Sequence, residues 1–171
     1  MRRWFVRSGA IVALAMAAVL ALGAPSAFAK SYEMTRVWID AEVAPDGSMM
    51  VTEERTYDFI GDYTFAYWEL DYGHASDIEV LGISGPEGEY TFSDIYGEDP
   101  NRTPQTYTLA DNGLVVDARA YFRAADTEHT LTLRYRVAGA ATRWQDTGEL
   151  YWKFIGDRWD LPSEDIRVHI S

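Results

Sequence analysis

The stretch Thr130-Leu131-Thr132-Leu133-Arg134-Tyr135-Arg136-Val137 decides the fold class, because polar and apolar residues alternate along its whole length. Successive side chains of a β-strand point to opposite faces, so this alternation predicts a strand with one buried face. The same period recurs in residues 32–43 and 49–59. Pro45-Asp46-Gly47-Ser48 lies between them and predicts a turn, since proline sets φ and glycine accepts a positive φ. We therefore expect a β-hairpin from about residue 34 to residue 59.

Shorter strands are indicated in the rest of the chain, at residues 63–70, 76–83, 106–109, 114–121 and 166–170. Asn112-Gly113 is a strong signal for a tight hairpin. Gly61-Asp62 is interpreted as a break after the second strand, and residues 93–105 as the longest loop. No segment after residue 29 has a sustained 3.6-residue period. The pattern predicts an all-β domain, an antiparallel β-sandwich of immunoglobulin-like architecture.

One strand carries charge where an apolar side chain is expected. Glu53 and Arg55 have the same parity as the apolar Val51 and Tyr57. Because successive residues of a strand alternate between faces, these four side chains share one face. We expect the middle of this strand to be less buried than its ends.

Residues 1–29 have the layout of a secretory signal peptide. Their first part is positively charged through Arg2, Arg3 and Arg7. A 13-residue apolar run from Ala10 to Leu22 follows, and the segment ends in the A-x-A pattern Ala27-Phe28-Ala29. The run is short for a membrane-spanning helix, and an uncleaved anchor is the alternative. We expect a signal peptide helix at 1–29, followed by an exported, extracytoplasmic domain at 30–171.

The overall charge excludes several partners. The chain has 15 Lys and Arg against 27 Asp and Glu, a formal net charge of −12, which becomes −15 once the leader and its three arginines are removed. Such acidity argues against nucleic acid and against anionic lipid headgroups. There is no cysteine, so thiol chemistry and disulfides are excluded.

Aromatic residues provide the candidate binding site. They are densest in residues 149–162, and we expect the strands before this stretch to pack against it. The candidate ligand-binding residues are Tyr67, Trp68, Trp152 and Trp159. They could stack on sugar rings; the alternative is that they fill the core, as aromatic side chains commonly do. Exposure of the three tryptophans distinguishes the two, because buried tryptophans cannot form a sugar platform.

Other chemistries have weak support in the sequence. Acidic clusters in residues 94–99 and 157–165 would suit Ca²⁺, but neither matches a spaced calcium loop. Glu53/Glu54 and Glu69/Asp71 are nominal glycosidase pairs, although such pairs arise by chance in an acidic chain. The three histidines lack metal spacing, and no G-x-S-x-G or phosphate-binding glycine loop occurs. We therefore predict no catalytic residue, no metal site and no cofactor.

Four segments in order carry a family resemblance: Asp46 to Glu53, Tyr57 to Gly61, Leu131 to Ala140, and Glu149 to Pro162. In this spacing the chain resembles the N-terminal region of predicted bacterial membrane proteins grouped as domain of unknown function 2207 (DUF2207). The resemblance implies a signal peptide, an extracytoplasmic β domain and later transmembrane helices. No such helices follow here, so we expect an N-terminal fragment of a longer membrane protein, associated with the membrane through segments missing from this chain. The family implies no established activity.

The leading hypothesis is a non-enzymatic extracytoplasmic β-sandwich that acts in recognition or assembly at the cell envelope. Its partner would be an unknown envelope protein or a glycan. The alternative is a carbohydrate-binding module or a glycan-acting enzyme that uses exposed aromatics and paired carboxylates. An acidic, calcium-dependent adhesion domain is a third hypothesis.

Overall fold

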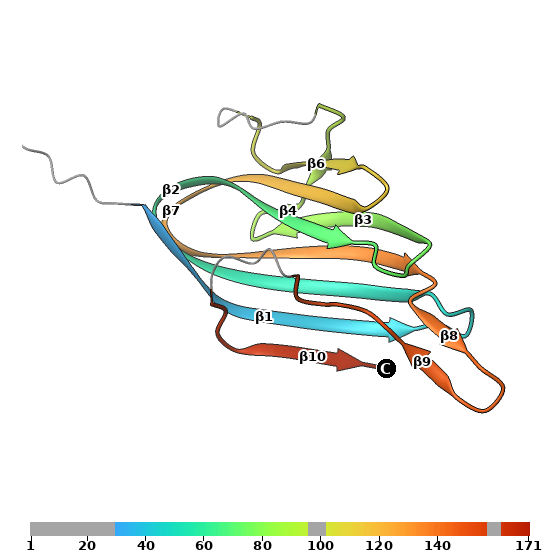
Figure 1. Ribbon diagram of the computed structural model, residues 1–171. Coiled ribbons are helices and arrows are strands. Elements are labelled where there is room, and N and C mark those ends of the chain that lie inside the picture. Colours follow the sequence, from blue (N-terminus) through green and yellow to red (C-terminus); the bar gives the residue numbers. More distant parts are fainter. Residues whose placement is uncertain (1–29, 96–101, 157–161) are drawn as a thin grey trace, which may run out of the picture.

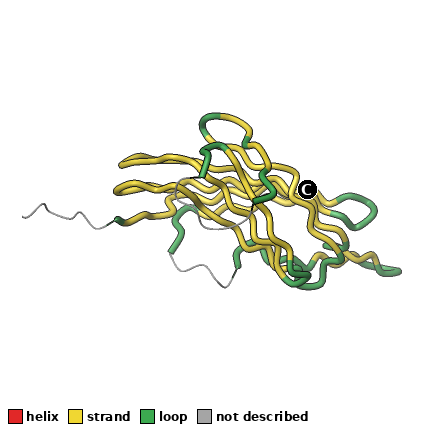
Figure 2. Tube along the Cα trace, turned by 90° about the horizontal axis from the view of Figure 1, so that it is seen from above, coloured by secondary structure: helices red, strands yellow, loops and turns green. Residues whose placement is uncertain are grey.

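The computed structural model describes residues 30–95, 102–156 and 162–171, and this part of the chain is built of strands and loops (Figures 1 and 2). The predicted signal peptide, residues 1–29, lies outside the described residues. The strands are β1 (Ser31–Val43), β2 (Met49–Asp71), β3 (Asp77–Gly85), β4 (Gly88–Glu89), β5 (Thr91–Phe92), β6 (Thr106–Asp111), β7 (Val115–Ala138), β8 (Ala141–Arg143), β9 (Gly148–Leu150) and β10 (Ile166–Ile170). The all-β prediction is confirmed.

The expected hairpin forms from β1 and β2. These strands pair antiparallel, with Val43 opposite Met49 next to the turn. In the turn, the Asp46 carboxylate accepts hydrogen bonds from the backbone N–H and the hydroxyl of Ser48, and Gly47 adopts a φ of +81°. The second predicted hairpin is also present, since β6 and β7 pair antiparallel around Asn112-Gly113.

The predicted break at Gly61-Asp62 is wrong, because β2 continues through it. β2 and β7 are paired along almost their whole length, with register shifts between Phe59 and Asp62 and between Tyr63 and Phe65. Gly61 has a φ of +89°, and its N–H donates to Asp126, which itself has a φ of +47°. The irregular backbone therefore bends the two strands together instead of ending them. Figure 1 shows β2 and β7 turning at one end and running back.

This bend makes two layers from one sheet. The first layer holds β10, β1, residues 49–60 of β2, residues 127–138 of β7, β3 and β4. The second layer holds residues 63–71 of β2, residues 115–124 of β7, β6 and β5. The arrangement is sandwich-like, but the sheet is mixed, because β10 runs parallel to β1 and β5 runs parallel to β6.

The apolar residues of the alternating stretch 130–137 face the core, as predicted. Leu131, Leu133, Tyr135 and Val137 are buried, while Arg134 is exposed. At the bend, aromatic rings join the layers: Phe59 stacks on Tyr63 at 4.4 Å between ring centroids, and on Phe122 at 5.7 Å. Their burial adds favourable free energy to closure of the two layers.

Candidate functional site

A cavity of about 390 Å³ lies between the two layers. Ligand sites in proteins are commonly concave and of roughly 300–1,000 Å³. Both arms of β2 contribute to the wall, together with the segment that follows β9. The lining residues are Tyr32, Met34, Glu53, Arg55, Tyr57, Phe59, Tyr63, Phe65, Ala66, Tyr67, Glu69, Leu70, Asp71, Val115, Tyr135, Trp152, Lys153, Phe154 and Gly156.

Glu53 and Arg55 form a buried ion pair in this wall. The expectation that the middle of β2 is less buried is wrong, since Glu53 is 1% exposed and Arg55 8% exposed. Arg55 Nε donates a hydrogen bond to Glu53 Oε1. Burial is the largest single influence and opposes the charge on the guanidinium, but Glu53 and Tyr57 together outweigh it, and the pKa of Arg55 is raised. The two charges are therefore buried together because each compensates the other.

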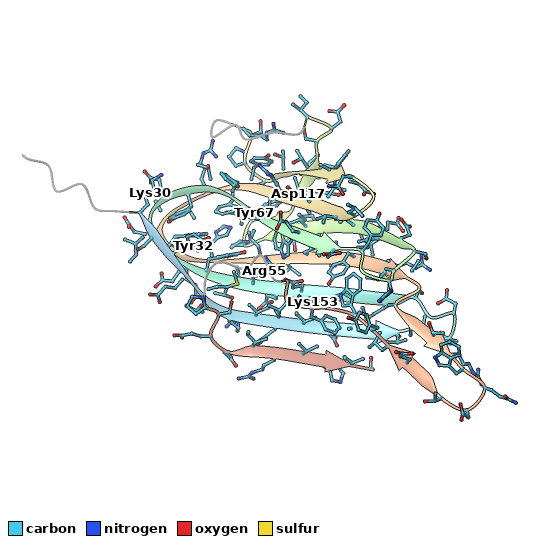
Figure 3. The ribbon with its side chains drawn as sticks, in the orientation of Figure 1. Lys30, Tyr32, Arg55, Tyr67, Asp117 and Lys153 are labelled. Atoms are coloured by element: carbon cyan, nitrogen blue, oxygen red, sulfur yellow. The ribbon has the colours of Figure 1, made fainter. Side chains whose placement is uncertain are left out.

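Arg55 also ties the first layer to the second. Its Nη1 donates to the backbone carbonyl of Tyr67 at 3.2 Å, and its guanidinium lies over the ring of Trp68 at 5.0 Å. Figure 3 shows Arg55, Tyr67 and Lys153 gathered in the middle of the molecule. One side chain thus joins residue 55 to the other arm of the same strand.

Two polar atoms in the cavity wall have no hydrogen-bond partner in the part of the chain that the structure describes. They are Glu53 Oε2 and Trp152 Nε1. Burial raises the pKa of Tyr135, and the neighbouring Trp152 N–H opposes that rise, but the N–H and the hydroxyl do not have the geometry of a hydrogen bond. Buried polar atoms are nearly always paired. Other unpaired atoms occur elsewhere in the described residues, but these two belong to residues that line one cavity, where a single molecule could pair with both.

The structure places the four predicted binding residues differently. Tyr67 is 44% exposed and lines the cavity. Trp68 is fully buried against Arg55 and cannot contribute to an exposed platform. Trp152 is partly buried in the cavity wall, and Trp159 lies outside the described residues. Tyr67 and Trp152 are therefore brought to one cavity, while Trp68 serves the core.

The described part of the aromatic stretch, residues 149–156, packs against the core through some of its side chains. Within residues 149–156, strand structure is confined to the end of β9. Trp152 and Phe154 pack against the core, whereas Tyr151 and Lys153 are exposed, so the alternation expected for a strand persists without strand pairing. Residues 157–161 are outside the described part.

The paired carboxylates and the acidic clusters named from the sequence do not form one site. Glu54 pairs with Arg36 on the face opposite Glu53, so Glu53 and Glu54 cannot act on one substrate. Glu69 and Asp71, in contrast, both line the cavity. Among the described residues there is no cluster of three potential metal ligands. Most of the acidic clusters at 94–99 and 157–165 fall outside this part.

The buried ion pair of Glu53 and Arg55 in the cavity wall was not predicted from the sequence. Their shared parity with apolar neighbours was the available signal, but it was interpreted as exposure. Opposite charges two residues apart on a strand lie on the same face and can neutralise each other. Burial of the pair was therefore an equally good interpretation of the same pattern.

Two solved structures have a distant likeness to this chain. Yeast LTA4 hydrolase in complex with Bestatin has 8% identity and a TM-score of 0.39, with 71% of this chain and 18% of that chain covered. A candidate protease of Parabacteroides distasonis has 12% identity and a TM-score of 0.33, with 65% of this chain and 24% of that chain covered. This chain thus spans less than a quarter of either protein, and the likeness carries no argument about function. No curated protein matches the chain.

The family resemblance implies membrane-spanning helices. The described residues contain no helix that is long and apolar enough to cross a bilayer. Residues 33–171 match the model of the "Predicted membrane protein (DUF2207) N-terminal domain". This range includes all of the β1–β2 hairpin except its first two residues, and the whole of the bent pair β2–β7. The chain therefore belongs to the DUF2207 family of predicted membrane proteins.

Proposed function

We propose that this chain is the extracytoplasmic recognition domain of a membrane protein of the cell envelope, and that it is not an enzyme. The observation that supports recognition most strongly is the aromatic cavity with two unpaired polar atoms in its wall. The leader at 1–29 supports export. The membrane-protein family supports a place at the membrane.

A binding role fits the charges in the cavity better than catalysis does. A general acid or base must exchange a proton with the substrate. Glu53 instead compensates the charge of Arg55 in a buried pair, and its removal would leave that charge unpaired. Its free oxygen can accept a hydrogen bond from a ligand without any change of protonation.

The location is tested by labelling of a single cysteine. The chain has no cysteine, so Leu114→Cys, at a turn residue that is 73% exposed, introduces one defined thiol. In cells that produce the full-length protein, a membrane-impermeant maleimide should label the variant before lysis, and the parent protein provides the background. Labelling only after lysis would contradict an extracytoplasmic location.

Recognition is tested by photo-cross-linking in the same cells. A photoreactive phenylalanine at Tyr67, in the cavity wall, should capture an envelope component, while the same group at Leu114 should not. Equal capture from both positions would contradict a role for the cavity.

A glycan-acting enzyme is the second candidate, because Glu69 and Asp71 line the cavity together. This function predicts release of reducing sugar from cell-wall polysaccharide by the purified domain, and loss of that release in Glu69→Gln. We expect no release. Release that depends on Glu69 would replace the binding proposal.

A further inference from the structure

We propose that the cavity binds a neutral sugar ring that accepts a hydrogen bond from Trp152 Nε1, donates one to Glu53 Oε2 and stacks on the aromatic wall. The inference rests on the proposed function, because it assumes that this cavity is the recognition site. It adds the chemical class of the ligand, a pyranose with free hydroxyl groups.

The two unpaired atoms determine which hydrogen-bonding groups fit. Glu53 Oε2 can only accept a hydrogen bond and Trp152 Nε1 can only donate one. A hydroxyl group does both, whereas an ammonium group only donates and a carboxylate or phosphate only accepts. A ligand with neighbouring hydroxyl groups therefore satisfies both atoms at once.

The charges in the cavity favour a neutral ligand. The charge of Glu53 is already compensated by Arg55, so an ionic ligand that reaches Glu53 Oε2 would lose its hydration without gaining a counter-charge from this buried pair. The chain as a whole carries −12, which disfavours anions further. The other charged residues of the wall are two carboxylates, Glu69 and Asp71, and one cation, Lys153, so nucleotides and sugar phosphates are disfavoured as well.

The shape of the wall favours a ring. Aromatic rings are contributed by the first strand, by both arms of β2, by β7 and by the segment after β9; they are Tyr32, Tyr57, Phe59, Tyr63, Phe65, Tyr67, Tyr135, Trp152 and Phe154. The flat faces of such rings suit the apolar C–H faces of a pyranose. At about 390 Å³ the cavity is at the small end of the range for ligand sites, which fits a short saccharide.

The experiment is a titration of the intact ¹⁵N-labelled chain with glucose and with N-acetylglucosamine. The indole N–H signal of Trp152 is identified by its loss in Trp152→Phe. One of the two sugars should shift this signal saturably, with a dissociation constant on the order of 1 mM. Trp152→Phe keeps an aromatic ring, although a smaller one, but lacks the donor, so affinity measured from backbone signals should fall roughly tenfold.

The matched control is Trp144→Phe. Trp144 is 56% exposed on the β8–β9 hairpin, and its Nε1 donates to Glu149 at 3.3 Å. This variant should bind as the parent does. Tyr67→Ala, at the exposed rim of the cavity, should also weaken binding. It replaces Trp152→Phe in the test if that variant does not fold.

Three results would overturn the proposal. They are no shift of the Trp152 signal by either sugar at about 20 mM, equal affinity of all variants, or saturable binding of the peptide Ala-Tyr-Ala in place of the sugars. The last result would assign the cavity to an extended peptide. These three results leave the maleimide labelling of Leu114→Cys unaffected. Failure of the sugar proposal can therefore be distinguished from failure of the proposed extracytoplasmic location.

Discussion

Replacement of Arg55 by methionine tests the physical account of the cavity wall. The change removes the cation but keeps much of the apolar volume. It leaves Glu53, which is 1% exposed, as a buried carboxylate without its counter-charge. Breaking a buried ion pair in this way costs about 3–5 kcal/mol. The lost hydrogen bond to the Tyr67 carbonyl is part of that cost, since such contributions do not add independently.

The magnitude is large against a total stability of about 5–15 kcal/mol. With a urea m-value of about 2 kcal/mol/M, a loss of about 4 kcal/mol moves the unfolding midpoint down by about 2 M. The assay is urea unfolding followed by tryptophan fluorescence at neutral pH. Arg134→Met is the matched control, because Arg134 lies on the same sheet and pairs with Glu89 in solvent at 2.8 Å. It should cost less than about 1 kcal/mol.

The double variant Glu53→Met, Arg55→Met separates the charges from the packing. With both charges removed, no buried ion is left, and stability should return to within about 1 kcal/mol of the parent or exceed it. Equal costs for Arg55→Met and Arg134→Met would refute burial of the pair. A double variant as unstable as Arg55→Met would instead show that the contacts to Tyr67 and Trp68 hold the layers together.

Three further predictions concern other parts of the fold. Burial lowers the pKa of His129 from its ordinary value of 6.5. The folded state is therefore most stable above about pH 6.5, where the ring is neutral, and it loses stability as the pH falls below that value. The urea midpoint should be lower at pH 5.5 than at pH 7.5, and His129→Gln should make this difference smaller. Gly61→Ala should destabilise by about 1–2 kcal/mol in thermal or urea unfolding, because φ is +89° and only glycine adopts such angles without strain; an unchanged midpoint would mean that the bend does not need glycine. Phe122→Ala should cost about 3–5 kcal/mol, since Phe122 is fully buried between Phe59 and His129, and a smaller effect in calorimetry would contradict tight packing at the bend.

The sequence alone determined the class of the fold and most of its strands. Alternation along residues 130–137 and 32–43 predicted which side chains are buried, because a strand has a period of two whatever its partners are. Turn residues such as Gly47 and Asn112-Gly113 located the hairpins, because their conformational preferences are local. The family resemblance was likewise carried by segments that can be recognised in order along the chain.

Only the tertiary structure decided how the sheet bends and where the cavity lies. Gly61 ends a strand or bends it with equal ease, and the choice depends on whether β7 follows the same bend, through contacts more than 60 residues away such as Gly61 with Asp126. The burial of Glu53 and Arg55 depends likewise on Trp68 and Tyr67 returning over them in the second layer. Local periodicity carries no information about such long-range contacts, and this is why the sequence predicted strands and turns but not the ion pair on which the candidate site is built.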